Sequence, residues 1–109
     1  MRVLVVTDSD ACCGPMAAAF LNDYSAEIEA VSAGRCPLQS IELSIVAAMK
    51  ECLIDLSGYV PKSIETIRLK DFDLVYECPD TPCPTAMNAV RELRDSLKNE
   101  AYLFFKSHM

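Results

Sequence analysis

Residues 3–20, with the sequence VLVVTDSDACCGPMAAAF, decide the fold because they predict a strand, a tight loop and a helix in succession. Four consecutive branched apolar residues, 3–6, are typical of a strand that is buried on both faces, as in a parallel sheet. The polar residues that follow, with Gly14, suit a turn, and Pro15 suits the first helical position. Such a strand–loop–helix directs backbone N–H groups toward one point, which favours an anion or a thiolate.

Length, composition and charge narrow the class of protein. A chain of 109 residues is long enough for one domain, which we place at residues 1–109. A hydrophobic content of 51% excludes a disordered chain, and no apolar run is long enough to span a membrane. The apolar run near the start is too short for a signal peptide, so we expect a cytoplasmic protein. A net charge of −6 without a basic cluster argues against nucleic acid as a partner.

The rest of the chain alternates predicted helices and strands. The expected elements are a strand at 27–32, a helix at 40–53, a short helix at 63–67 capped by Ser63, a strand at 72–76 and a long helix from Thr85. This alternation predicts a small α/β domain with three layers, in which a parallel sheet has right-handed crossovers and helices on both faces.

The cysteines gather at one edge of the expected sheet. Functional loops of such sheets follow the carboxyl ends of the strands, here residues 7–14, 33–38 and 77–84. Five of the six cysteines lie in these loops: Cys12, Cys13, Cys36, Cys78 and Cys83. We expect the sixth, Cys52, to be a buried thiol on a helix. If the strand order is 2-1-3, Cys12, Cys13, Cys78 and Cys83 could converge.

Several motifs in the right order resemble the low-molecular-weight protein tyrosine phosphatases and the thioredoxin-coupled arsenate reductases. The first strand and loop lead into Gly-Pro-Met-Ala-Ala-Ala, as the family's strand leads through Cys-x5-Arg-Ser-Pro-Met-Ala-Glu. Residues 31–34 match the family's Ser-Ala-Gly turn, 48–57 its helix ending in Gly-Ile-Asp-Leu/Ile-Ser, and 71–75 its third strand. Cys78 and Cys83 resemble the redox pair of the reductase branch. The resemblance implies strand order 2-1-3. The segment that would carry the family's fourth strand and its general-acid Asp-Pro is missing between Cys83 and the last helix.

The loop departs from the family pattern at its most important positions. Thr7 stands where the family has its nucleophilic Cys, and Cys13 and Gly14 stand where it has Arg and Ser. A Thr hydroxyl without a base is a poor nucleophile, and loss of the Arg removes the clamp on an oxyanion. Asp8 and Asp10 add negative charge. Phosphatase chemistry is therefore not expected from this loop.

Three hypotheses remain open. The first is thiol redox or oxyanion-related chemistry, with Cys12, Cys13, Cys78 and Cys83 as candidate catalytic residues. The candidate anion-binding loop comprises Thr7, Asp8, Ser9, Asp10, Ala11, Cys12, Cys13 and Gly14. A small oxyanion or a thioredoxin-like protein would be the partner, and no cofactor or resident metal is expected. The second hypothesis is binding of As(III) or another soft metal by these thiols. The third is an inactive pseudophosphatase that binds or regulates a partner.

The remaining polar residues have simpler interpretations. Arg35 could replace the lost Arg, although a solvated charge in a turn is the simpler reading. Tyr59 and Lys62 are expected at the surface or in a lid over the site, and Asp8 and Asp10 are expected to form hydrogen bonds within the loop. An exposed edge of a three-stranded sheet would favour a homodimer.

Overall fold

A three-stranded parallel sheet forms the centre of the computed structural model, which describes residues 1–78, 83–84 and 86–108. The elements in chain order are β1 (Arg2–Thr7), α1 (Cys13–Tyr24), β2 (Glu29–Gly34), α2 (Leu43–Lys50), the 3₁₀ helices η1 (Ile64–Thr66) and η2 (Leu69–Asp71), β3 (Leu74–Glu77) and α3 (Met87–His108). The strands have the order β2-β1-β3. This confirms the predicted parallel sheet and its order 2-1-3. Among the described residues no fourth strand adjoins β3.

The central strand β1 is held along its whole length. It pairs with β2 from Arg2↔Glu29 to Thr7↔Gly34 and with β3 from Val3↔Leu74 to Val6↔Glu77. Residues 3–7 are all buried, as expected for an apolar strand covered on both faces. Because the pairing is parallel, the carboxyl ends of all three strands, and the loops that follow them, lie at one edge of the sheet.

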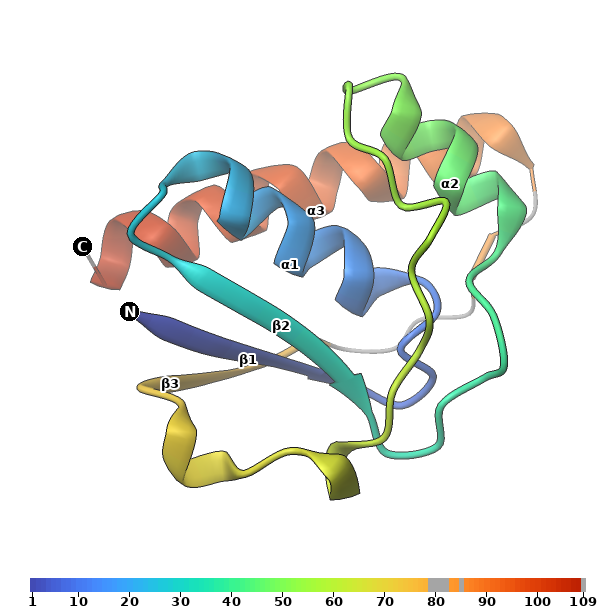
Figure 1. The fold of residues 1–109 in the computed structure, drawn as a ribbon. Helices are drawn as coiled ribbons and strands as arrows, with labels where there is room; N and C mark the ends of the chain where they lie inside the picture. The colour runs from blue at the N-terminus through green and yellow to red at the C-terminus, as the bar shows by residue number, and fades with distance from the viewer. Residues whose placement is uncertain (79–82, 85, 109) are drawn as a thin grey trace.

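Different kinds of structure cover the two faces of the sheet. The three α-helices lie on one face, and the segment with η1 and η2 crosses the other (Figure 1). The helical side holds the larger core, which includes Val3, Val5, Phe20, Met49 and Val90. On the opposite side a small cluster of Leu4, Val6 and Ala33 packs against Ile64, Ile67 and Phe72. The layers on both faces agree with the predicted fold class.

The boundaries of α1 and the strands differ slightly from those expected. Helix α1 begins at Cys13, so that Pro15 is its third residue and not its first. Proline is tolerated there because the first four N–H groups of a helix have no partner within the helix. Strands β2 and β3 lie one or two residues further along the chain than their patterns indicated. Ser63 does cap η1, because its side chain accepts a hydrogen bond from the amide of Glu65.

Helix α2 is shorter at both ends than the apolar spacing predicted. Glu42 remains extended and its amide donates to the carbonyl of Ala11, in the loop after β1. At the other end, Leu53 adopts φ 63° and is 96% exposed. This left-handed conformation ends the helical path, so the half-buried Cys52 lies beyond α2, contrary to expectation.

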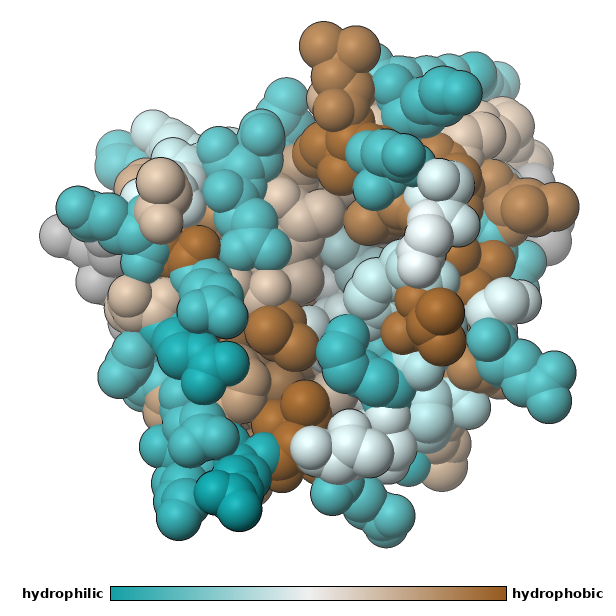
Figure 2. All heavy atoms as spheres, in the orientation of Figure 1, coloured by the Kyte–Doolittle hydropathy of each residue, from teal (hydrophilic) through white to brown (hydrophobic). Residues whose placement is uncertain are grey.

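The exposed apolar side chains are scattered. On the face shown in Figure 2 they emerge in several small groups, including one over the end of α2, with hydrophilic side chains between them. Of the large apolar residues that the structure describes, Leu43, Leu53 and Val60 are the most exposed. Among the described helices, none has both the length and the apolar character needed to cross a membrane.

Candidate functional site

The loop between β1 and α1 is held by the backbone of the segment that follows β2. Four carbonyl groups, that of Thr7 at the end of β1 and three in the loop, accept hydrogen bonds from amides in that segment. The pairs are Arg35 to Thr7 (3.0 Å), Cys36 to Asp8 (2.7 Å), Leu38 to Ser9 (3.0 Å) and Glu42 to Ala11 (3.5 Å). The loop conformation is therefore set largely by contacts with residues some thirty positions away, which no local pattern records.

Thr7 is packed inside the loop. It is 1% exposed, and its Oγ1 accepts a hydrogen bond of 3.1 Å from the amide of Asp10. A Cβ at Gly14 would lie 3.0 Å from this Oγ1, so glycine at the start of α1 leaves room for the hydroxyl. Thr7 therefore acts as a structural residue of the loop in this geometry.

Asp10 is completely buried and has φ 51°. Its Oδ2 accepts hydrogen bonds from the hydroxyl of Tyr59 at 2.5 Å and from the amide of Lys62 at 2.9 Å. The hydroxyl of Ser32 lies 2.5 Å from that of Tyr59. Burial is the main cause that raises the pKa of Tyr59, followed by its hydrogen bond to Asp10, so the phenol remains protonated and donates. Asp10 was expected to form hydrogen bonds within the loop, but only its amide does so, and its carboxylate bonds to Tyr59 and Lys62 outside the loop.

The network around Asp10 was not predicted from the sequence. Tyr59 and Lys62, expected at the surface or in a lid, are half-buried, and the hydroxyl of Tyr59 and the amide of Lys62 also hold the loop through Asp10. The nearest sequence signal is an Asp in a tight loop, a residue type that tolerates the left-handed conformation. It does not reveal which distant residue is the partner.

Arg35 spans the edge of the sheet as an exposed ion pair. Its guanidinium lies 3.3 Å from the carboxylate of Asp8 and 2.9 Å from that of Glu77, and its side chain is 48% exposed. This agrees with the reading of a solvated charge in a turn. Because two carboxylates already contact it, Arg35 does not offer a vacant clamp for an anion.

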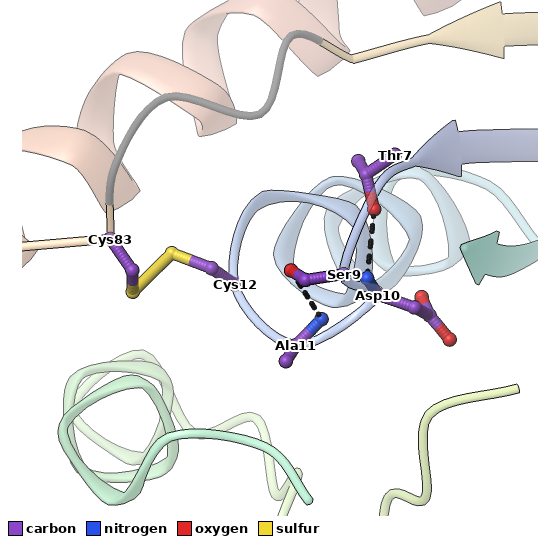
Figure 3. Close-up of a disulfide and its surroundings, with 6 residues drawn as sticks. All are labelled: Thr7, Ser9, Asp10, Ala11, Cys12 and Cys83. Carbon is purple, nitrogen blue, oxygen red and sulfur yellow. Dashed lines mark hydrogen bonds between the residues drawn. A yellow bond between two sulfur atoms is a disulfide. The ribbon is translucent and has the colours of Figure 1, made fainter. Parts of the chain in front are cut away.

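The disulfide in the structure joins Cys12 to Cys83, whose Cα atoms are 6.1 Å apart (Figure 3). The resemblance had implied Cys78 as the partner of Cys83. Cys78 is instead a buried thiol, as is Cys13. Sheet order 2-1-3 explains the pairing that forms, because the loop after β1 and the segment after β3 lie at the same sheet edge. Residues 79–82 of the expected proline-rich loop lie outside the described residues.

The two buried thiols both lie near Tyr76 of β3. Burial raises the pKa of Tyr76 to about 12, and negative charge on Cys78, Glu100 and Cys13 contributes in that order. All four cysteines singled out from the sequence therefore lie around the same end of the sheet. Cys36 is exposed elsewhere in the loop after β2.

The described part of the chain holds no preformed metal centre. Across residues 1–78, 83–84 and 86–108, no three His, Cys, Asp or Glu side chains group closely enough to hold a metal ion. With Cys12 and Cys83 in a disulfide, two of the four candidate thiolates are also unable to act as ligands.

A family model covers most of this chain. Residues 2–101 match the model of the low molecular weight phosphotyrosine protein phosphatases, and the chain is a member of that family. The comparison with curated proteins gave no match.

Solved structures with the same fold have several activities. One similar structure is an arsenate reductase in the phosphate-binding state, with 20% identity, 97% of each chain covered and a TM-score of 0.85. A low molecular weight protein tyrosine phosphatase from T. tengcongensis has 22% identity, covers 98% of this chain and 99% of its own, and has a TM-score of 0.85. The YwlE arginine phosphatase from Geobacillus stearothermophilus has 17% identity, with 97% and 91% covered and a TM-score of 0.77. At these identities the likeness establishes the fold alone.

Proposed function

We propose that this chain is a thiol–disulfide redox protein built on the low-molecular-weight phosphatase fold, with Cys12 and Cys83 as its redox couple. The observation that supports the proposal best is the disulfide between the loop after β1 and the segment after β3. Hydrolysis of phosphate esters has little support, because Thr7 is buried at the nucleophile position and Cys13 replaces the family's Arg.

The reaction that we propose is reduction of this disulfide by a protein dithiol, such as a thioredoxin-like partner. A thiolate of the dithiol attacks Sγ of Cys83, which is the less buried of the two sulfurs. The S–S bond breaks and its electron pair goes to Sγ of Cys12. The second thiol of the partner then attacks the mixed disulfide, which releases Cys83 and leaves the partner oxidised.

Cys12 is suited to receive that electron pair. It occupies the N-cap position of α1, where the positive end of the helix dipole stabilises a thiolate. A stabilised thiolate is also a good leaving group in thiol–disulfide exchange. Cys83 therefore acts as the sulfur that is attacked and Cys12 as the sulfur that leaves.

The electron acceptor that we propose is a small oxyanion, with arsenate as the first to test because arsenate reductases share the fold. The reduced pair would supply two electrons and two protons, so that arsenate becomes arsenite and water and the pair becomes a disulfide. No free Arg clamp is available in the described loop, so we expect a weakly bound substrate.

Alkylation followed by intact mass measurement and peptide mapping tests the redox couple. The native protein is treated with iodoacetamide before and after reduction by a thioredoxin-like dithiol. We expect reduction to free Cys12 and Cys83 alone, with consumption of the dithiol. If both sulfurs are free under mild oxidation and react slowly, the redox proposal is wrong.

The second candidate function, which applies if the redox proposal is wrong, is that of a binding or regulatory module without turnover. The observation that favours this second function is the packed loop, in which the Thr7 hydroxyl and several carbonyl groups already have protein partners. Addition of arsenate together with the dithiol distinguishes catalytic turnover from a single reduction of the disulfide. Consumption of the dithiol in proportion to arsenate supports turnover, and consumption of one equivalent only contradicts it.

A further inference from the structure

The loop that carries Cys12 is fixed from two opposite sides. The side chain of Cys12 leaves it toward Cys83, and the side chain of Asp10 leaves it in the other direction (Figure 3). Asp10 meets Tyr59 and the amide of Lys62 on that second side. The two attachments share no atoms, so breaking the disulfide leaves the Asp10 attachment in place.

Asp10 holds the loop through one oxygen of its carboxylate, because the other, Oδ1, is buried without a hydrogen-bond partner among the described residues. The carboxylate is fully buried, and its Oδ2 accepts two hydrogen bonds, of 2.5 and 2.9 Å. Hydrogen bonds to a buried charged group are stronger than those between neutral groups. Its amide also donates to Thr7, which closes the turn that leads to Cys12 two residues later. The position of Asp10 therefore sets the direction of the backbone at Cys12.

Tyr59 is itself held in place by two further contacts. The hydroxyl of Ser32 contacts its oxygen at 2.5 Å, and Nζ of Lys62 lies 4.7 Å from the centre of its ring. Ser32 is a buried residue of β2, where it pairs with Val5 of the central strand β1. Tyr59 thus connects the loop to the rigid sheet by a side chain with a single polar atom.

We propose that Asp10 and Tyr59 are positioning residues of the redox pair, which keep Cys12 opposite Cys83 after the disulfide has been reduced. The inference rests on the proposed function. Two thiols separated by 71 residues meet rarely in a mobile chain, whereas a fixed loop keeps their effective concentration high. The hydrogen bonds of Asp10 thereby favour the oxidised state without contacting either sulfur.

The test is a glutathione titration of the folded full-length protein. The Cys12 and Cys83 thiols react with one glutathione disulfide to give the protein disulfide and two glutathione molecules. Alkylation and peptide mapping at each ratio give the equilibrium constant of this reaction. The variants are Tyr59→Phe, Asp10→Asn and Ser32→Ala, and each is confirmed as folded by circular dichroism.

Tyr24→Phe is the matched control. Its hydroxyl also donates one hydrogen bond, of 2.6 Å, to the carbonyl of Lys98, far from the loop. Loss of stability alone would affect both Tyr variants, whereas only Tyr59→Phe should change the equilibrium constant within the folded protein.

We expect Tyr59→Phe to lower the equilibrium constant about tenfold, in line with loss of one charged hydrogen bond. Asp10→Asn keeps an acceptor oxygen and tolerates the left-handed conformation, but its hydrogen bonds become neutral, so it should lower the constant less than Tyr59→Phe does. Ser32→Ala should give a smaller decrease than Tyr59→Phe, and it replaces that variant if Tyr59→Phe does not fold.

The outcomes separate the inference from the function on which it rests. If the wild type forms the Cys12–Cys83 disulfide and both Tyr59→Phe and Tyr24→Phe match it, positioning by Tyr59 is wrong. Equal decreases in the two Tyr variants would likewise show a general effect of stability. If the wild type forms no such disulfide at any glutathione ratio, the proposed redox function itself fails.

Discussion

Helix α3 is attached to the rest of the molecule in two contrasting ways. Just before it begins, the disulfide of Cys83 ties the chain covalently to the loop after β1. Further along, Arg91 and Arg94 form ion pairs with Glu51, one residue beyond α2, at 2.8 and 2.7 Å. The first attachment responds to redox conditions, and the second responds to pH and salt. Reduction therefore breaks the covalent attachment only, while the ion pairs and the buried residues Val90, Leu97 and Ala101 keep α3 docked.

The covalent attachment should have the largest effect on stability. The double variant Cys12→Ser/Cys83→Ser should lower the free energy of unfolding by about 4 kcal/mol, because the closed loop spans 71 residues. Urea unfolding under oxidising conditions measures this difference. The control is Cys36→Ser, which removes an exposed thiol and should leave stability unchanged. A double variant as stable as the wild type would show that the disulfide does not contribute more to stability than the ion pairs do.

On the ionic side, Arg94 should matter more than Arg91. Arg94 is largely buried and donates to the carbonyl of Ala48 as well as to Glu51, whereas Arg91 is more exposed. We expect Arg94→Met to lower the free energy of unfolding by about 1 kcal/mol and Arg91→Met to have a smaller effect. Urea unfolding of both variants gives the ranking, and the reverse order would contradict it.

The backbone beside this ionic attachment is strained. Leu53 has a left-handed conformation that costs most residues about 1 kcal/mol, and its side chain is almost fully exposed. Leu53→Gly should therefore stabilise the protein, by about 0.5 kcal/mol after the greater freedom of glycine in the unfolded chain is subtracted. Thermal unfolding measures the change. The control variant is Gly58→Ala, because an added Cβ at Gly58 would meet no other atom within 4 Å. A lower melting temperature for Leu53→Gly would show that the exposed side chain has a stabilising contact.

The smallest expected effect is a pH dependence of the ion pair. Hydrogen bonds from Arg91 and then Arg94 lower the pKa of Glu51 from 4.5 to about 2. Because the pKa is lower in the folded state, the stabilisation is present above pH 4.5 and is lost as the pH falls toward 2. The difference in stability between the wild type and Glu51→Gln should therefore shrink over this range. A difference that stays constant from pH 5 to pH 2 would contradict the assignment.

The parts of the fold that follow from short stretches of sequence could be predicted. The apolar run at residues 3–6 indicated the buried central strand, and Ser63 indicated the start of η1. The ends of α2 could not be predicted, because they depend on the bond from Glu42 to Ala11 and on the left-handed Leu53. The clustering of Cys12, Cys13, Cys78 and Cys83 could be predicted, because each follows a strand at the same edge of the sheet. Their roles remain predictions.

The sequence by itself determined that a buried strand, a tight loop and a helix follow one another, because each depends on residues close together in the chain. It also placed the candidate thiols in loops at one edge of the sheet. Only the tertiary structure decided that Cys12 meets Cys83 and that Asp10 meets Tyr59, 71 and 49 residues away. Such pairings depend on the distance and direction of side chains after the sheet has formed, and local patterns in the sequence do not contain that information.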